Sequence, residues 1–214
     1  MIDKFLFPTE NVCSFCKDYD ENLIYGLCEE CRDRIEELHA KVNLKTDFVD
    51  DLYVSIFYNR FAKDFIHQYK FNNKSYLFKT FSSYMNKTLC ELEIFDYDLI
   101  IPVPIHRRKE AIRGYNQSYL LANEIAKYNK KPIYKDVLIK RKWTKEQNKL
   151  NLYERRLNLS SSFIVKREKI ILDKKILLID DIVTTGMTLE LCSKELKENG
   201  ADKIIGLCLS TPIR

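Results

Sequence analysis

Glycine, proline and long apolar runs are scarce in this chain of 214 residues, and each scarcity excludes a class of protein. Five glycines and five prolines are too few for a long flexible linker, so we expect one ordinary domain with a small addition. No uninterrupted apolar run approaches the ~20 residues that cross a bilayer, which predicts no membrane insertion. The segment 1–11 has too short an apolar patch for a signal peptide, and we therefore expect a cytoplasmic protein.

Two common phosphate-binding signatures are absent as well. The chain has no Gly-Lys-Ser/Thr for a P-loop and no G-x-G-x-x-G for a dinucleotide-binding fold. Hydrophobic residues make up 45% and charged residues 31% of the sequence, so the chain has material for a globular core and is not disordered.

Positive charge is concentrated in one segment. The formal net charge is +5, but residues 140–169 alone contain ten Lys/Arg and three Glu. Such a segment favours anionic partners, either phosphates or nucleic acid. A solvated surface loop is the alternative interpretation.

Four of the seven cysteines follow a metal-binding pattern near the N-terminus. The pattern is C-x2-C, eleven residues, then C-x2-C, formed by Cys13, Cys16, Cys28 and Cys31. Two such knuckles complete a tetrahedral S4 site for Zn²⁺, and with four protein ligands the zinc is structural. Disulfide pairing is the alternative, which a reducing compartment disfavours.

The remaining cysteines and the histidines lack metal-ligand spacing. We predict that three cysteines are small core residues: Cys90, Cys192 and Cys208. No metal is assigned to the three histidines: His39, His67 and His106.

Beyond the cysteines, strands alternate with helices. We expect strands over 50–59, 97–104, 133–141, 174–181 and 203–210, and helices over 32–44, 60–71, 116–130 and a segment ending at 199–200. Asn116 or Ser118 is available as a helix cap. Phe61, Phe65 and Tyr69 share one helix face, which favours core packing. Alternating strands and helices predict a parallel α/β sheet, whose ligands bind at the carboxyl ends of the strands.

One of these strand ends carries unusual chemistry, "LLIDDIVTTGMT". A buried strand ends on Asp180 and Asp181, and hydroxyls then surround a glycine: Thr184, Thr185, Gly186 and Thr188. A glycine and hydroxyls at a helix N-terminus suit a phosphate. The two carboxylates repel phosphate. They instead accept hydrogen bonds from hydroxyl groups or bind a divalent cation. A phosphorylated sugar offers both groups, whereas a merely structural βα loop is the alternative.

This stretch resembles the phosphoribosyl-pyrophosphate (PRPP) loop of type I phosphoribosyltransferases, and the whole chain resembles the ComF family, associated with DNA uptake in natural competence. The resemblance includes the four cysteines, "QYKFNN" (68–73), "DLIIPVPIHRRKEAIRGYNQSYLLA" (98–122) and "TKEQNKLNLYERRLNLSSSF" (144–163). In the last segment the family spacing is met at Thr144, Gln147, Leu150, Arg155, Asn158 and Phe163. Ser161 and Ser162 stand where the family commonly has Gly-Ala.

The resemblance implies a fold and a mechanism. The fold is a type I phosphoribosyltransferase-like sheet at 46–214, with a flexible basic segment about 140–162, after a zinc module and its helix at 1–45. An acceptor attacks the anomeric carbon while Mg²⁺-bound pyrophosphate leaves, so catalysis is positioning and charge stabilisation. Asp180 and Asp181 would hold the ribose hydroxyls, and 184–188 the 5′-phosphate. Pyrophosphate would meet five cations: Lys70, Arg107, Arg108, Arg113 and Arg155.

Two functions remain open at this point. The first is a PRPP-binding transferase. The second is a non-catalytic protein that handles single-stranded nucleic acid and retains the phosphoribosyl site, which the zinc module, basic segment and exposed aromatics suit. From the family's association we also expect single-stranded DNA and a DNA-uptake helicase or channel as partners.

Overall fold

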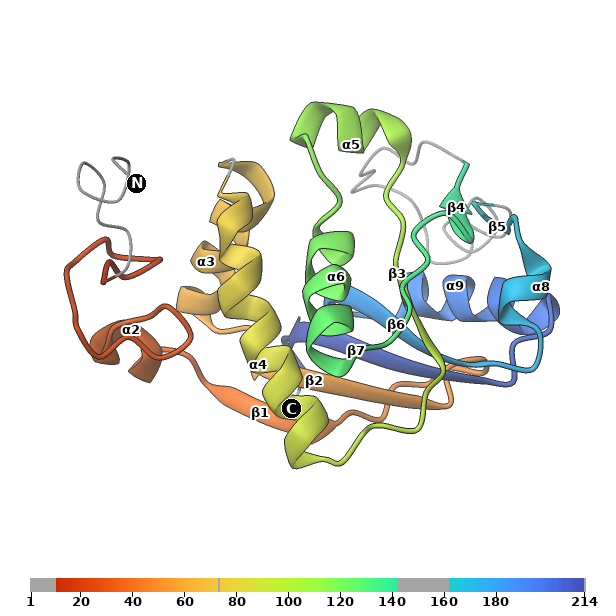
Figure 1. Cartoon of the computed structure of the whole chain (residues 1–214), viewed down its shortest axis with the longest axis horizontal. Helices are drawn as coiled ribbons and strands as arrows, with labels where there is room; N and C mark the ends of the chain where they lie inside the picture. Colours follow the sequence, from red (N-terminus) through yellow and green to blue (C-terminus); the bar gives the residue numbers. More distant parts are fainter. Residues whose placement is uncertain (1–10, 73, 142–161, 214) are drawn as a thin grey trace.

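The protein is an α/β fold built on a five-stranded sheet, described by a computed structural model over residues 11–72, 74–141 and 162–213. The strands lie in the order β1 (Glu37–Lys41), β2 (Asp51–Phe57), β7 (Lys203–Thr211), β6 (Lys175–Ile182) and β3 (Leu99–Pro102). β1 pairs antiparallel with β2, and the other neighbours run parallel. Figure 1 shows the sheet with helices on both faces, so the predicted fold class is confirmed.

Alternation along the strands divides the core in two. Leu177 and Ile179 of β6 pack with α3 (Arg60–Phe71), α4 (Phe78–Glu91) and α6 (Gln117–Asn129). Ile176 and Leu178 face the opposite way, toward α8 (Glu168–Ile171), α9 (Met187–Glu198) and a small antiparallel sheet of β4 (Leu138–Lys140) and β5 (Phe163–Val165). A strand buried on both faces needs a continuous apolar run, which β6 has until it reaches its two aspartates.

Local sequence determines where two site-forming helices begin. Asn59 caps α3 by accepting a hydrogen bond from the amide of Ala62 at 2.8 Å. Asn116 caps α6 by accepting from Ser118 at 3.0 Å, as one of the two predicted caps. The predicted aromatic face of α3 is confirmed as core, since Phe61, Phe65 and Tyr69 are all buried.

The cysteine segment packs directly on these helices. It contains α2 (Glu29–Asp33). Further along the chain, a 3₁₀ turn, η1 (Ser75–Leu77), directly precedes α4. The Phe15 ring lies 4.5 Å from Phe61 and 4.9 Å from Phe65, centroid to centroid. The cysteine segment therefore shares the core of the larger domain.

The helix predicted over 32–44 is wrong. α2 ends at Asp33, and β1 follows as an edge strand. Its side chains alternate: Leu38 packs against one core cluster, while the His39 ring hydrogen-bonds to Thr88 of α4 on the other side at 2.8 Å. The helical spacing of apolar residues was overridden because the open edge of β2 takes a strand as its partner. The division at residue 45 stays a prediction, although 37–41 lie in the main sheet.

Further corrections concern the middle of the chain. The strand predicted over 133–141 is only β4, and β4 pairs with β5 outside the main sheet. Cys192 and Cys208 are buried as predicted, but Cys90 is exposed, because it lies in the last turn of α4. The short helix α5 (Arg107–Arg113) had no prediction.

Two observations bear on the remaining expectations. Within the described ranges, no helix combines the length and apolar character that crossing a bilayer requires. Most of the basic segment lies outside the described residues, including Arg155 and the family positions from Thr144 to Asn158.

Candidate functional site

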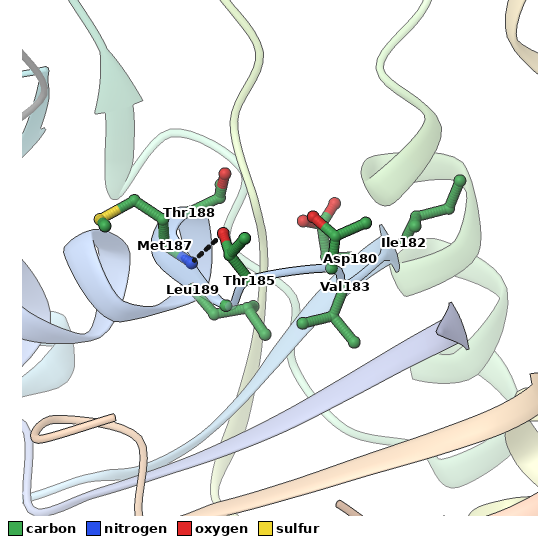
Figure 2. Close-up of a pocket in the computed structure, with 9 residues that line it drawn as sticks. Asp180, Ile182, Val183, Thr185, Met187, Thr188 and Leu189 are labelled. Carbon is green, nitrogen blue, oxygen red and sulfur yellow. Dashed lines mark hydrogen bonds between the residues drawn. The ribbon is translucent and has the colours of Figure 1, made fainter. Parts of the chain in front are cut away.

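The loop between β6 and α9 forms a small hydroxyl-lined cradle. Asp180 and the residues from Ile182 to Leu189 line a cavity of about 40 Å³ (Figure 2). Gly186 is the N-cap of α9 with φ +75° and contributes no side-chain cap. The nearest hydroxyl contact is long, 3.5 Å from the Met187 amide to Thr185 Oγ1. The first amides of a twelve-residue helix therefore face the cradle with little competition from side chains, as an anion site requires.

Gly186 is needed for conformational and steric reasons. A left-handed φ disfavours any residue with a Cβ, and an added Cβ would lie 3.1 Å from Leu44 Cδ1. The segment before β2 thus packs against the loop from behind.

Asp180 and Asp181 have different partners. The Ser118 hydroxyl donates to Asp180 Oδ1 at 2.9 Å, and the Asp181 amide donates to the same oxygen at 2.9 Å. Burial raises the pKa of the Asp180 carboxyl, and the charge of Asp181 raises it further, to about 7, against these hydrogen bonds and the charge of Lys70. Asp180 is therefore poised between its neutral and charged forms near neutral pH.

Asp181 is buried and ion-paired. Its Oδ2 lies 2.8 Å from Lys70 Nζ, on α3. A buried carboxylate needs such a partner because desolvation is costly. The structure thus brings together the predicted hydroxyl-binding acid and a predicted pyrophosphate cation.

A cleft of about 370 Å³ surrounds this pair. Its volume lies within the range of small-molecule sites. Its charged lining consists of the two aspartates and five cations: Lys63, Lys70, Lys109, Arg113 and Lys140. Positive charge exceeds negative charge, so the cleft suits a ligand with several anionic groups.

The other predicted site residues are distributed around this cleft. Thr184, Thr185 and Gly186 line the cradle, and Thr188 lines both cradle and cleft. Arg107 lines a neighbouring cavity of about 800 Å³. Arg108 is exposed and is not among the residues that line the cradle, the cleft or this neighbouring cavity. Arg155 lies outside the described residues. The roles of all these residues stay predictions.

Several cleft residues were missed by sequence reasoning. On α3 these are Lys63, His67 and Phe71, and on α6 Gln117 and Ser118. The spacing of 63, 67, 70 and 71 marks one helical stripe, and this was the available signal. It was missed because a polar helix stripe usually faces solvent.

Lys140 was predicted only as part of a basic segment. It ends β4 and lines both the cleft and the larger neighbouring cavity. Burial lowers the pKa of its ammonium group, and nearby Lys109 lowers it further, while Asp180 offsets part of this. A desolvated lysine of this kind gains from an anionic ligand.

The four N-terminal cysteines converge as predicted. All four sulfur atoms lie within 4.8 Å of one another, and Cys16 Sγ lies 3.7 Å from Cys28 Sγ. Four sulfurs around one zinc stand about 3.8 Å apart for Zn–S bonds of about 2.3 Å. The cluster can therefore hold a zinc ion.

Comparisons with known proteins show which families and proteins this chain resembles. Residues 116–211 match the family described as Phosphoribosyl transferase domain, a range that includes α6, β6, the loop and β7. The chain is similar to Competence protein ComFC of Streptococcus pneumoniae, with 36% identity over 69% of this chain and 62% of that protein. It therefore spans less than two thirds of that relative.

A second relative aligns over more of its length. The chain is 26% identical to Competence protein ComFC of Bacillus subtilis, over 91% of this chain and 81% of that protein. Among solved structures, the purine phosphoribosyltransferase of Pyrococcus horikoshii aligns at 20% identity and a TM-score of 0.39, covering 61% of this chain and 70% of that one.

Proposed function

Because this chain is a ComF-type competence-protein homologue with a phosphoribosyl transferase domain, we propose that it binds PRPP in the cleft at the carboxyl end of β6. The observation that carries the proposal is that an anion-binding helix end, a pair of carboxylates and a cluster of cations lie side by side. A hydroxyl-lined helix N-terminus adjoins two aspartates, and the five cations of the cleft lie around them. PRPP has one 5′-phosphate, two ring hydroxyls and one diphosphate, and each has a matching partner.

The 5′-phosphate occupies the cradle of residues 184–188. There the α9 amides and the hydroxyls of Thr184, Thr185 and Thr188 act as donors. Phosphate at this helix end is favoured further by the macrodipole. Gly186 allows the backbone to approach the phosphate closely.

The ribose hydroxyls donate to Asp180 and Asp181. When Asp181 accepts a hydrogen bond from the sugar, Lys70 leaves Asp181 and binds the diphosphate. Lys109 and Arg113, which also line the cleft, bind the same group. Two carboxylates beside phosphates are also the usual protein ligands of Mg²⁺, so Asp180 and Asp181 would hold an ion whose charge neutralises the leaving diphosphate. Arg107, Arg108 and Arg155 remain further candidates for that group.

The proposed activity is transfer of the phosphoribosyl group. The protein contributes orientation and electrostatic stabilisation of the leaving diphosphate, without a covalent nucleophile. We place this activity in the handling of imported DNA, since both bacterial relatives are named for competence. The cysteine cluster holds a structural Zn²⁺ in this proposal.

Calorimetric titration with PRPP and Mg²⁺ tests the binding step. We expect saturable heat with the wild type and at least a tenfold weaker affinity for Asp181→Asn, because hydrogen bonds to charged groups are worth about 1.5–3 kcal/mol. Asp202→Asn is the matched control, since Asp202 is exposed just before β7. Wild-type protein that gives no heat would rule out the proposed function.

A further inference from the structure

A separate cavity of about 710 Å³ lies where the cysteine segment meets α4 and α6. Among the residues that the structure describes, it shares no lining residue with the phosphate cradle or the PRPP cleft. Its volume lies within the range of small-molecule sites, which occur preferentially where two parts of a protein meet. The proposed phosphoribosyl transfer leaves this cavity without a role.

Three tyrosines bring flat surface to the cavity. Tyr25 comes from the cysteine segment, Tyr76 from η1 and Tyr128 from α6. They are 37%, 40% and 64% exposed, respectively. The Tyr25 ring packs on the buried ring of Tyr84 with centroids 5.2 Å apart, which holds it in place. Aromatic rings that line a cavity and keep an exposed face are suited to stacking with a planar ring.

Lys17 brings positive charge to the same cavity. Its Nζ donates to the Tyr76 hydroxyl at 2.6 Å and to the Ser14 carbonyl at 3.0 Å, and it lies 4.4 Å from the centroid of the Tyr76 ring. An ammonium group has three donors, so these contacts within the described part of the chain leave one for a ligand oxygen. Lys79 follows Tyr76 by three residues on the same helical face and adds a second cation to the lining. Two cations in one cavity favour an anionic ligand.

Hydroxyl groups and a carboxylate complete the lining. Gly26 has a left-handed φ of +74°, and an added Cβ would lie 3.0 Å from Ser14 Oγ and 3.3 Å from Thr80 Oγ1. The absence of a side chain at Gly26 therefore allows both hydroxyls to lie close to its backbone. Glu124 of α6 also lines the cavity, and a carboxylate accepts hydrogen bonds from hydroxyl groups.

We propose that this cavity binds a free nucleoside monophosphate, at a site separate from the PRPP cleft. The base stacks on the tyrosines, the phosphate binds Lys17 and Lys79, and the sugar hydroxyls donate to Glu124. An inorganic anion would leave the tyrosines unused, and an uncharged ring would leave the lysines unused. Because the ligand contacts the cysteine segment, α4 and α6 together, its binding also stabilises the packing of that segment on the two helices.

Calorimetric titration of the full chain with adenosine 5′-monophosphate (AMP) tests this site. Because the PRPP cleft also accepts phosphates, the titration is made with and without excess PRPP and Mg²⁺, and in Lys70→Met, which alters the cleft alone. Tyr76→Leu removes a flat face, Tyr76→Phe keeps it, and Lys79→Met removes one cation. Tyr19→Leu is the matched control, because Tyr19 is 66% exposed in the same cysteine segment and is not among the residues described as lining the cavity.

With PRPP and Mg²⁺ present, we expect AMP to bind the wild type, Lys70→Met and Tyr19→Leu alike. Tyr76→Leu should bind AMP about tenfold more weakly, as loss of stacking on an aromatic side chain predicts, and Tyr76→Phe should retain the affinity. Lys79→Met should bind AMP about fivefold more weakly, because a charge-assisted contact to the phosphate is lost. Lys79 is exposed, so this variant tests the cavity even where Tyr76→Leu fails to fold.

Four results would overturn the proposal: AMP does not bind, PRPP abolishes AMP binding, Tyr76→Leu and Lys79→Met both keep the wild-type affinity, or adenosine without a phosphate binds as tightly as AMP. Binding of a thymidine oligonucleotide by a chain that does not bind AMP belongs to the first of these. If the wild type does not bind PRPP, AMP binding that is kept in Lys70→Met and weakened in Tyr76→Leu supports the cavity and rules out only the PRPP proposal.

Discussion

Lys70 of α3 and Asp181 of β6 form an ion pair, with 2.8 Å between Nζ and Oδ2. The two side chains come from different elements and are both largely removed from solvent. The pair neutralises the acid at the end of the strand. It also places a cation in the cleft that we propose as the PRPP site.

Replacing Lys70 by Met is expected to weaken PRPP binding by tenfold or more, because a charge-assisted contact to the diphosphate is lost. Asp181 also loses its partner, which should lower the stability of the fold. Calorimetric titration measures the affinity, and urea unfolding reports the state of the fold. Lys127→Met is the control, since Lys127 makes an exposed pair with Glu124 on α6. Equal affinity in the wild type and Lys70→Met would exclude Lys70 from the ligand site.

The raised pKa of Asp180, about 7, predicts a specific pH dependence of stability. The folded state holds the proton more tightly than the unfolded chain, where a free aspartate has a pKa of about 3.9. The contribution of Asp180 to stability is therefore fully present below about pH 4 and is lost as pH rises toward about 7. Urea unfolding between pH 4 and 8 should show this decline in the wild type and a flatter profile in Asp180→Asn.

Ligand binding should change in the opposite sense over the same pH range. The charged carboxylate accepts from hydroxyls and binds Mg²⁺ better than the neutral acid, so PRPP affinity should rise as Asp180 ionises. Asp180→Asn should lack this part of the rise. The phosphates of PRPP titrate nearby and affect both proteins alike, so the difference between them is the measure. Identical profiles in the two proteins would contradict the role of Asp180.

The loop and its strand could be predicted because their information is local. Asp180, Asp181 and the threonines are contiguous, and a buried apolar strand before a glycine and a helix indicates where they lie. The four-cysteine cluster could be predicted equally well, since metal-ligand spacing is a property of the sequence.

The rest depends on contacts between distant segments. Nothing in the sequence near Lys70 indicates Asp181 as its partner, and Phe71 looks like one more aromatic residue of α3 until Arg113 is placed beside it. β1 was mistaken for a helix because its true partner, β2, supplies the hydrogen bonds that decide between the two structures.

Loss of one cysteine of the cluster should remove zinc and destabilise the chain. Cys28→Ser leaves three sulfurs where a structural zinc site needs four ligands, and the Phe15 contact with α3 loses its anchor. We expect zinc content near zero and a melting temperature lower by about 5 °C or more. Cys90→Ser is the control, because Cys90 is exposed and outside the cluster. Freshly reduced wild-type protein without zinc would contradict the assignment.

Substituting alanine at two glycines separates the ligand role of the loop from its role in folding. Gly186 (φ +75°) and Gly200 (φ +95°) are both left-handed, and a Cβ at either would meet a leucine Cδ1, at 3.1 and 2.8 Å respectively. Each alanine should therefore destabilise the fold by more than about 1 kcal/mol. Only Gly186→Ala changes the backbone of the proposed phosphate cradle, so PRPP affinity should fall in that variant and remain at the wild-type value in Gly200→Ala. Urea unfolding and calorimetry measure the two effects. A similar loss of PRPP affinity in both variants would mean that general destabilisation, rather than the shape of the cradle, limits binding.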